Sequence, residues 1–254
     1  FMASLAAGVA NSYCGVGVAH HAKFSWMVMS ARSPTVVKLD SLRRCQQHDI
    51  CVEEMASDAP LLIRVQESEV DMMHTALREG RNGKGTVFVW GSGDKRSEGF
   101  TCNHNGYLNQ PFGIIVGSVS QDGEITKYSS QCSALFVVAP GGDEGKLGLT
   151  SADSGNKCEI NRGGNSTSAS AALVAGVVGL LLEQRKDLSW RDVMHILIKS
   201  ANSEKLKSKT PWKINGGKFK VHDDFGFGLV DAFAALRIAQ HWVPVPRLRA
   251  IELH

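Results

Sequence analysis

This sequence has no strong excess of either charge and no apolar run long enough to cross a bilayer. Its 28 basic and 25 acidic residues leave a net charge of +3, and no block of like charge interrupts the chain. Nothing here is typical of a nucleic-acid-binding surface. The longest apolar run, 171–182, is well short of the ~20 residues of a spanning helix. We therefore predict a compact globular protein with no nucleic-acid partner and no membrane segment.

Cysteine pairs at the CxxC spacing of metal sites are also missing. The six cysteines are scattered, and none lies beside suitably spaced histidines, which argues against a zinc site. Disulfides and buried thiols are both open at this point, because free buried cysteine is common in cytosolic enzymes. The cysteines are Cys14, Cys45, Cys51, Cys102, Cys132 and Cys158.

The amino terminus lacks the pattern of a secretion signal. The chain begins at Phe1 rather than Met, without the charged, apolar and small-residue regions that signal peptides carry. We expect a fragment or a processed product. Internal repeats and low-complexity tracts are absent as well.

The apolar content is sufficient for one sizeable core. With 254 residues, 43% of them hydrophobic, the chain is expected to form a single α/β domain. Predicted strands alternate with predicted helices, which indicates a largely parallel sheet flanked by helices. We predict strands at 16–19 with 25–29, 49–52, 86–90, 113–120 and 135–139, and helices at 36–48, 64–80, 168–185, 189–201 and 230–242.

Helix and loop boundaries follow from local signals. Gly80 is expected to end the helix 64–80, and a cap region at Asp187 and Ser189 opens the helix 189–201. Residues 202–228 are rich in Lys and Gly and are predicted to be an exposed excursion between two helices. The Pro-containing stretch 243–247 is typical of a linker or domain exit.

The stretch GGNSTSASAALVAG (163–176) places hydroxylated residues directly before an apolar helix. A serine at a helix start is near backbone N–H groups that can face a developing oxyanion, so Ser168 is a candidate nucleophile. The alternative is an ordinary N-cap, which Ser or Thr before an apolar run commonly forms, and Ser166 and Thr167 are predicted to cap the helix. A GxSxG nucleophile elbow is absent around Ser168, which argues against an α/β-hydrolase of small molecules.

Several blocks of the sequence resemble, in chain order, the subtilases and specifically the kexin/furin-like proprotein convertase branch. STSASAALVAG (166–176) is similar to the serine motif of that family, which implies that Ser168 is its nucleophile. The resemblance also implies a subtilisin-like fold over residues 1–242, and an exit toward a downstream β-rich domain at 243–254. The other blocks are AAGVANSYCGVGVA (6–19), GRNGKGTVFVWGSGD (80–94), TCNHNGY (101–107), KYSSQCS (127–133), LSWRDVMH (188–195) and FGFGLVDAFAA (225–235).

The resemblance implies two disulfides and one calcium loop. It pairs Cys14 with Cys158 and Cys102 with Cys132, which makes a secretory-pathway or extracellular location the expectation. Cys45 and Cys51 have no counterpart in the family, so free or buried thiols are expected there. Calcium (Ca²⁺) is placed in the loop 6–19, where it would be bound by the carbonyls of Gly8, Tyr13 and Gly15 and the side chain of Asn11.

The sequence departs from the family at the catalytic residues. The family uses Asp, then His, then Ser; the resemblance implies the His just before Phe1 and the Asp further upstream. The nine histidines of this chain, His20, His21 and His195 among them, lie in no HGT context. We therefore expect the chain as given to have little or no hydrolytic activity. Asp94 stands where the family commonly has the oxyanion-binding Asn, and an ionised carboxylate repels an oxyanion.

The substrate cleft departs from the family too. Ser92 and Gly93 are expected to form the strand edge that pairs with an extended substrate. Asn105 replaces an Asp of the pocket that recognises basic residues, and Phe100 and Ser130 replace acidic ligands of a second calcium site, which removes the basis for both properties. The SWGP wall of the cleft is replaced by EMASDA (54–59), where Asp58 is a possible remnant.

Two functions from different classes follow from these features. The first is a serine endopeptidase that hydrolyses polypeptides of the secretory pathway through an acyl-enzyme on Ser168, with an upstream propeptide as a further partner. The second is a pseudoprotease that binds a peptide or partner without cleaving it, which would account for Asp94 and the altered cleft.

Overall fold

A parallel four-stranded sheet is the centre of the protein. The computed structural model describes residues 1–27, 33–53, 62–143, 145–146, 148–153, 157–160 and 165–248. The strand order is β1-β2-β3-β4, and every neighbouring pair is parallel. The predicted α/β fold with a largely parallel sheet is confirmed. The strands are β1 (Ile50–Glu53), β2 (Val87–Gly91), β3 (Gly113–Val119) and β4 (Leu135–Pro140).

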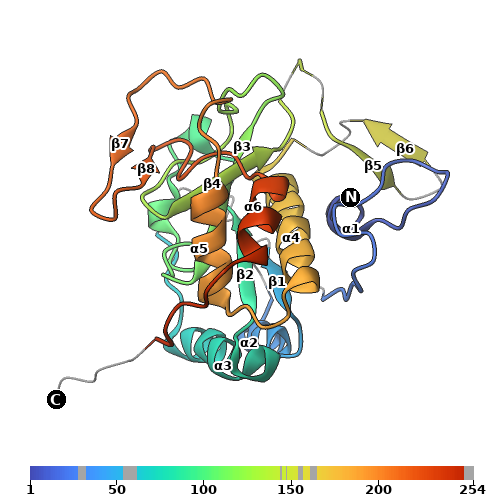
Figure 1. Cartoon of the computed structure of the whole chain (residues 1–254), viewed down its shortest axis with the longest axis vertical. Helices are drawn as coiled ribbons and strands as arrows, with labels where there is room; N and C mark the ends of the chain where they lie inside the picture. The colour runs from blue at the N-terminus through green and yellow to red at the C-terminus, as the bar shows by residue number, and fades with distance from the viewer. Residues whose placement is uncertain are drawn as a thin grey trace.

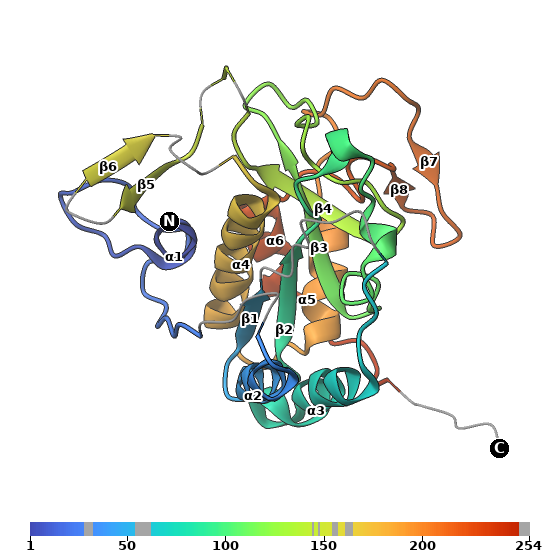
Figure 2. The ribbon, with the colours of Figure 1, turned by 180° about the vertical axis from the view of Figure 1, so that it is seen from behind.

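Helices cover both faces of the sheet because successive strand residues point to opposite faces and the side chains on both faces are apolar. Val89 and Val116 belong to the core that contains α4, α5 and α6, whereas Trp90 and Ile115 belong to the core that contains α2 and α3. Figure 1 shows α4, α5 and α6 in front of the sheet, and Figure 2 shows the sheet from behind, with α2 and α3 at its lower end. The helices are α2 (Thr35–Cys45), α3 (Glu67–Gly83), α4 (Thr167–Gln184), α5 (Trp190–Ser200) and α6 (Ala232–Gln240).

Helix α4 is the central core helix. Its small and apolar residues let it contact β1, β2, β3 and β4 as well as α6 and α1 (Met2–Ala7). It is long and apolar enough, by length and composition, to cross a membrane, but 72% of that stretch is buried inside the protein. That burial is what a core helix shows. Its amino end lies at the carboxyl edge of the sheet, where Ser170 Oγ donates to the Ala139 carbonyl at 3.1 Å.

The predicted opening of α5 is confirmed, and the regular part of α3 ends at Gly80 as predicted, although a last, distorted turn extends the helix to Gly83. Helical geometry in α3 breaks at Gly80 (φ −56°, ψ 148°), where a Cβ would lie 2.5 Å from Thr86 Oγ1. Helix α5 begins after Ser189, whose side chain accepts the Asp192 N–H while the Asp192 side chain accepts the Ser189 N–H. Local capping thus sets the start of α5, as the sequence indicates, whereas α3 breaks where its chain packs against Thr86.

Residues 16–19 are not a strand, so that prediction is wrong. The N–H groups of Val18 and Ala19 donate to the Leu5 and Ala6 carbonyls of α1 (Met2–Ala7), a helix that the pattern did not indicate. These bonds hold the segment against α1 and away from the sheet. Residues 25–27 form no strand, and 28–29 lie outside the described residues.

Two further expectations need correction. Cys45 and Cys51 form a disulfide (Cα–Cα 5.5 Å) that ties the end of α2 to β1, and are not free thiols. The excursion 202–228 is only partly exposed, because Leu206, His222 and Phe225 are buried. It contains an antiparallel hairpin, β7 (Lys213–Ile214) with β8 (Lys220–Val221), and a second hairpin, β5 (Thr150–Asp153) with β6 (Lys157–Ile160), lies earlier in the chain.

Candidate active site

Ser168 lies in the first turn of α4, at the carboxyl edge of the sheet. Ser166 is the N-cap, with extended backbone and an Oγ that accepts the Ala169 N–H at 3.1 Å. The predicted capping role of Ser166 is confirmed. Thr167 does not cap the helix, because its side chain bonds elsewhere. Ser168 is 6% exposed, so it lies just beneath the surface at a helix end whose N–H groups stabilise negative charge.

The loop after β2 is fastened to the start of α4 by two hydrogen bonds through one residue. Gly93 N–H donates to Thr167 Oγ1 at 3.0 Å, and Thr167 N–H donates to Asp94 Oδ1 at 2.7 Å. Close approach depends on Gly91, where a Cβ would lie 2.8 Å from Thr167 Oγ1 and 3.0 Å from Ser168 N. Thr167 and Gly91 were not predicted as site residues. The two glycines that flank Ser92 could have indicated that another part of the chain approaches the backbone closely there.

The geometry bears directly on the oxyanion position. Asp94 accepts a helix N–H through its carboxylate, and an ionised carboxylate has no hydrogen to donate to an oxyanion. An oxyanion that forms near Ser168 would be repelled by the Asp94 carboxylate. The oxyanion and the carboxylate would also both be attracted to the positive end of the α4 dipole. The arrangement can anchor α4 as it stands. It supports catalysis only if Asp94 is protonated or another group donates a hydrogen bond to the oxyanion.

The strand edge at Ser92 and Gly93 is largely engaged within the protein. Ser92 N–H donates to the Val116 carbonyl at 2.9 Å, and Gly93 O accepts the Ser130 N–H at 2.9 Å. Since Gly93 N–H is bonded to Thr167, three backbone groups that an extended substrate could use are occupied. The hydroxyls of Ser92 and Ser130 are buried and have no hydrogen-bond partner within the part of the chain that the structure describes.

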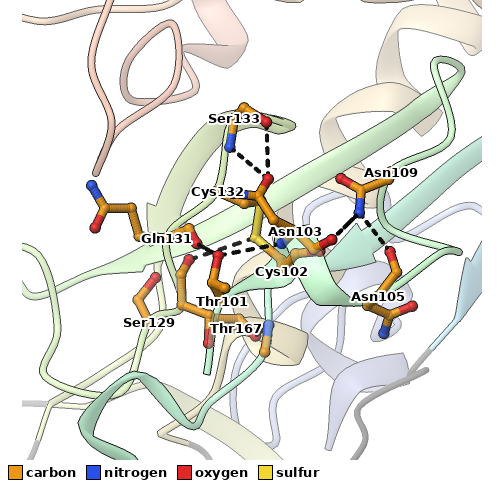
Figure 3. Close-up of a disulfide and its surroundings, with 12 residues drawn as sticks. Thr101, Cys102, Asn103, Asn105, Asn109, Ser129, Gln131, Cys132, Ser133 and Thr167 are labelled. Carbon is orange, nitrogen blue, oxygen red and sulfur yellow. Dashed lines mark hydrogen bonds between the residues drawn. A yellow bond between two sulfur atoms is a disulfide. The ribbon is translucent and has the colours of Figure 1, made fainter. Parts of the chain in front are cut away.

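A disulfide frames the loop that carries Asn105. The predicted pair Cys102–Cys132 is present (Cα–Cα 5.2 Å), and Figure 3 shows it beside Thr101 and Asn103. Asn105 is fully buried, and its Oδ1 accepts the Tyr107 N–H at 3.0 Å. Other hydrogen bonds around this disulfide run from Thr101 Oγ1 to the Gln131 carbonyl, from Ser133 to Asn103 Oδ1, and from Asn109 Nδ2 to the carbonyls of residues 102, 103 and 105 (Figure 3).

Phe100 and Ser130 both lie against Gly93. A Cβ at Gly93 would meet the Phe100 ring at 3.0 Å and Ser130 Oγ at 3.4 Å. Phe100 is 5% exposed, so an apolar ring occupies this space. Asp58, the possible remnant of the cleft wall, lies outside the described residues.

Tyr128 supports the turn that follows β4. Its hydroxyl lies 2.9 Å and 2.7 Å from the carbonyl oxygens of Gly141 and Gly142, and 2.7 Å from Ser118 Oγ. Burial raises the pKa of this hydroxyl to about 12, and the carboxylates of Asp94 and Asp143 act in the same direction. The phenol therefore stays protonated and bonded at neutral pH.

The loop predicted to bind calcium offers few ligands by itself. Asn11 Oδ1 accepts the Tyr13 N–H at 2.8 Å and Gly8 O accepts the Gly17 N–H at 2.9 Å. Together with the Tyr13 and Gly15 carbonyls, these groups offer four oxygens, fewer than the roughly six to eight that calcium takes. No group of three His, Cys, Asp or Glu side chains suited to a metal lies among the described residues. These residues do not complete a calcium site by themselves.

The loop is nevertheless tied down as predicted. Cys14 and Cys158 form a disulfide with a Cα–Cα distance of 5.4 Å, across 144 residues. It joins the loop after α1 to β6, a short distance along the chain before α4. Among the histidines named above, His195 stacks on Trp242 and its pKa is lowered by burial, which fits a structural role.

Comparison with known proteins identifies the family. The chain matches the subtilase family (peptidase S8) over residues 1–228. It belongs to the subtilase family. Its curated relatives are kexin/furin-like proprotein convertases: it is 32% identical over 257 residues to furin-like protease 1, isoform 1-CRR, of Drosophila melanogaster, 35% over 252 to proprotein convertase subtilisin/kexin type 6 of Homo sapiens, and 32% over 247 to human furin. The predicted resemblance is confirmed.

The matches cover nearly all of this chain but only part of each relative. The matches take in 98%, 95% and 95% of this subtilase chain, but 23%, 25% and 31% of the three relatives. The chain thus spans about a quarter to a third of their length. Among solved structures, the serine protease of Aeromonas sobria superposes with a TM-score of 0.81 at 18% identity, over 97% of this chain and 53% of that one. Fervidolysin from Fervidobacterium pennivorans gives 0.65 at 19% identity, over 93% and 35%. These likenesses show a subtilisin-like fold.

Proposed function

We propose that this chain is part of the catalytic domain of a subtilisin/kexin-type serine endopeptidase, with Ser168 as its nucleophile. The observation that carries the proposal is the place of Ser168, in the first turn of a buried helix whose start is fastened to the loop after β2. Family membership supports the same role.

The reaction assigned to this site is peptide-bond hydrolysis through an acyl-enzyme. Ser168 Oγ attacks the substrate carbonyl carbon while its proton passes to a general base, which the family supplies as a histidine. The amine leaves with a proton, and water then releases the acyl group. Within this chain, the positive end of the α4 dipole would favour the tetrahedral oxyanion, although the Thr167 and Ala169 N–H groups are already bonded to Asp94 and Ser166, and the Asp94 carboxylate opposes the oxyanion.

Polypeptides of the secretory pathway are the proposed substrates. Three disulfides among the described residues suit an oxidising compartment. The curated relatives are named as furins and proprotein convertases, and one solved relative is a protease in complex with its chaperone. A propeptide or chaperone partner is proposed on that likeness. Calcium binding stays a prediction of the resemblance.

Labelling of Ser168 tests this function. The longest natural polypeptide that contains this chain is treated with a fluorophosphonate probe, and the modified residue is located by mass spectrometry. We expect an adduct on Ser168, lost in Ser168→Ala and in heat-denatured protein. The matched control is Ser170→Ala, two residues along the same helix, where Oγ donates to the Ala139 carbonyl. It is expected to keep the label.

The pseudoprotease is the second candidate, and Asp94 is the observation that favours it. A carboxylate bonded to the helix start stabilises the fold without helping an oxyanion form. Folded protein that takes no label on Ser168, yet binds peptides, would support this alternative and contradict the first.

A further inference from the structure

The turn that follows β4 is bonded directly to the start of α4. Ser166 N–H donates to the Gly141 carbonyl at 3.3 Å, so the N-cap residue of the helix is joined to the first residue after the strand. Gly141 has no room for a side chain, because a Cβ would lie 2.0 Å from Ser118 Oγ and 2.6 Å from Ser170 Oγ. The Gly141 carbonyl therefore holds one side of the helix start, two residues before Ser168.

The Tyr128 hydroxyl bonds to the same carbonyl. It lies 2.9 Å from Gly141 O and 2.7 Å from Gly142 O, and Ser118 Oγ lies 2.7 Å from it. Carbonyl oxygens only accept, so the single phenolic hydrogen is donated to them, and the Ser118 hydroxyl donates to the phenol. Gly141 O thus has two donors, Tyr128 and Ser166, and the phenol helps to fix the position of this oxygen.

The backbone beside Tyr128 is bonded to the loop after β2. The Tyr128 carbonyl accepts the Arg96 N–H at 3.1 Å, and the Ser130 N–H donates to the Gly93 carbonyl at 2.9 Å. Asp94 belongs to this loop, and burial together with the charge of the nearby Asp94 carboxylate raises the pKa of the phenol. Tyr128 therefore stands between the loop after β2 and the turn after β4.

These bonds close a ring of four segments around the start of α4. Residues 128–130 bond to the loop 93–96, that loop bonds to the first turn of α4, the N-cap of α4 bonds to the turn after β4, and that turn bonds back to the Tyr128 hydroxyl. In such a network each bond restricts the movement of the groups that make the next one. Loss of the Tyr128 hydroxyl opens the ring at the turn after β4 and frees one side of the helix start.

We propose that Tyr128 is a positioning residue whose hydroxyl holds the start of α4 so that Ser168 Oγ is directed at the substrate carbonyl. Tyr128 acts through Gly141 and Ser166, without contact with the reacting atoms. The part that concerns the nucleophile rests on the proposed function, whereas the effect on the helix start does not. Misplacement of a reacting group by about 1 Å can cost roughly 10²-fold in rate, and loss of one bond of the ring should displace Ser168 by less than that.

The first test is the labelling of Ser168 in Tyr128→Phe, which removes one oxygen atom and keeps the aromatic ring. In the longest natural polypeptide that contains this chain, the rate of fluorophosphonate labelling is measured at several probe concentrations, which separates the maximal rate from probe binding. We expect the maximal rate to fall about tenfold, and the concentration that gives half of it to change by less than about twofold. Weaker probe binding with an unchanged maximal rate would overturn the proposal.

Thr86→Val is the matched control. Thr86 is buried at the amino end of β2, and its Oγ1 donates to the carbonyls of Cys45 and His48 at 2.9 Å and 3.0 Å. This variant also removes a buried hydroxyl that bonds two carbonyls, but at the opposite edge of the sheet from Ser168. Urea titrations show whether both variants are folded. Thr86→Val should label like the original chain, and equal slowing in both variants would mean a general loss of stability and would overturn the proposal.

Hydrogen exchange of the Ser166 amide tests the helix start without any label. In Tyr128→Phe this amide should exchange at least about threefold faster than in Thr86→Val, because its acceptor is less firmly held. Equal exchange in the two variants would overturn the proposal. This measurement also decides the matter if the original chain takes no label on Ser168, a result that would contradict the proposed function and not the role of Tyr128 at the helix start.

Discussion

Asp94 and Thr167 are joined by a 2.7 Å hydrogen bond from the Thr167 N–H to Asp94 Oδ1, across 73 residues of chain. The bond brings the residue at the oxyanion position onto the first turn of the helix that carries Ser168. Each residue therefore has two tasks, to hold α4 in place and to shape the environment in which an oxyanion would form.

Replacing Asp94 tests its effect on the oxyanion. In the complete protein, Asp94→Asn keeps an oxygen that can accept the Thr167 N–H and adds an N–H₂ that can donate to the oxyanion. We expect turnover at neutral pH to rise, by up to roughly 10²–10³-fold, and an acidic optimum to flatten. Steady-state kinetics across pH measure this. Asp94→Ala is the control, since it lacks both groups, and identical pH profiles for all three proteins would contradict the role.

Thr167 is expected to matter through its hydroxyl. Thr167→Val has nearly the same volume but cannot accept the Gly93 N–H, which would be left buried. The free energy of unfolding should fall by about 1–3 kcal/mol in denaturant titrations. Thr167→Ser keeps the acceptor and should recover most of that loss, whereas a loss in Thr167→Ser as large as that in Thr167→Val would contradict this role of the hydroxyl.

Gly91 is predicted to tolerate no side chain. Gly91→Ala places a Cβ 2.8 Å from Thr167 Oγ1 and 2.9 Å from the Thr167 carbonyl carbon, so α4 must move. We expect a loss of about 1–3 kcal/mol in the free energy of unfolding, together with weaker labelling of Ser168. Gly216→Ala, which meets nothing within 4 Å, is the matched control and should stay within about 0.5 kcal/mol.

Asp192 should make stability depend on acid pH. Burial acts to raise its pKa, but hydrogen bonds from Ser189, Trp242 and Val245 outweigh that effect, and the pKa lies below 3.8 in the folded protein. A lowered Asp pKa adds stability above pH 3.8, which is lost as the pH falls through the folded pKa. Urea titrations down to about pH 2 should show this loss, and a smaller one in Asp192→Asn.

The three disulfides should differ in what their removal costs. In the chain-entropy account, a crosslink restricts the unfolded chain more when it closes a longer loop. For separations of 144, 30 and 6 residues, replacing both cysteines by Ala should lower the free energy of unfolding by about 5, 4 and 2 kcal/mol. The order Cys14–Cys158, Cys102–Cys132, Cys45–Cys51 is the test, and a reversed order would contradict this account.

Sequence-based prediction succeeded where structure depends on neighbouring residues. Strands β2, β3 and β4 are short apolar runs bounded by turn residues, and α4 follows a serine that caps it. It failed at 16–19, where a Val and Gly alternation suits a strand but the N–H groups bond to α1 instead. It also missed the Cys45–Cys51 bond, because the spacing of two cysteines does not show that a helix end and a strand bring them together.

The sequence by itself determined the four strands of the sheet, the five helices α2 to α6, the family and the nucleophile candidate, since capping, apolar runs and motif spacing are properties of nearby residues. Only the tertiary structure decided what surrounds Ser168. Thr167 bonds Gly93 and Asp94 because β2 and α4 approach closely at Gly91, and packing chooses such partners across 73 or more residues. The sequence therefore shows that an acidic residue, Asp94, stands at the oxyanion position, but only the fold shows that this residue is bonded to the start of α4.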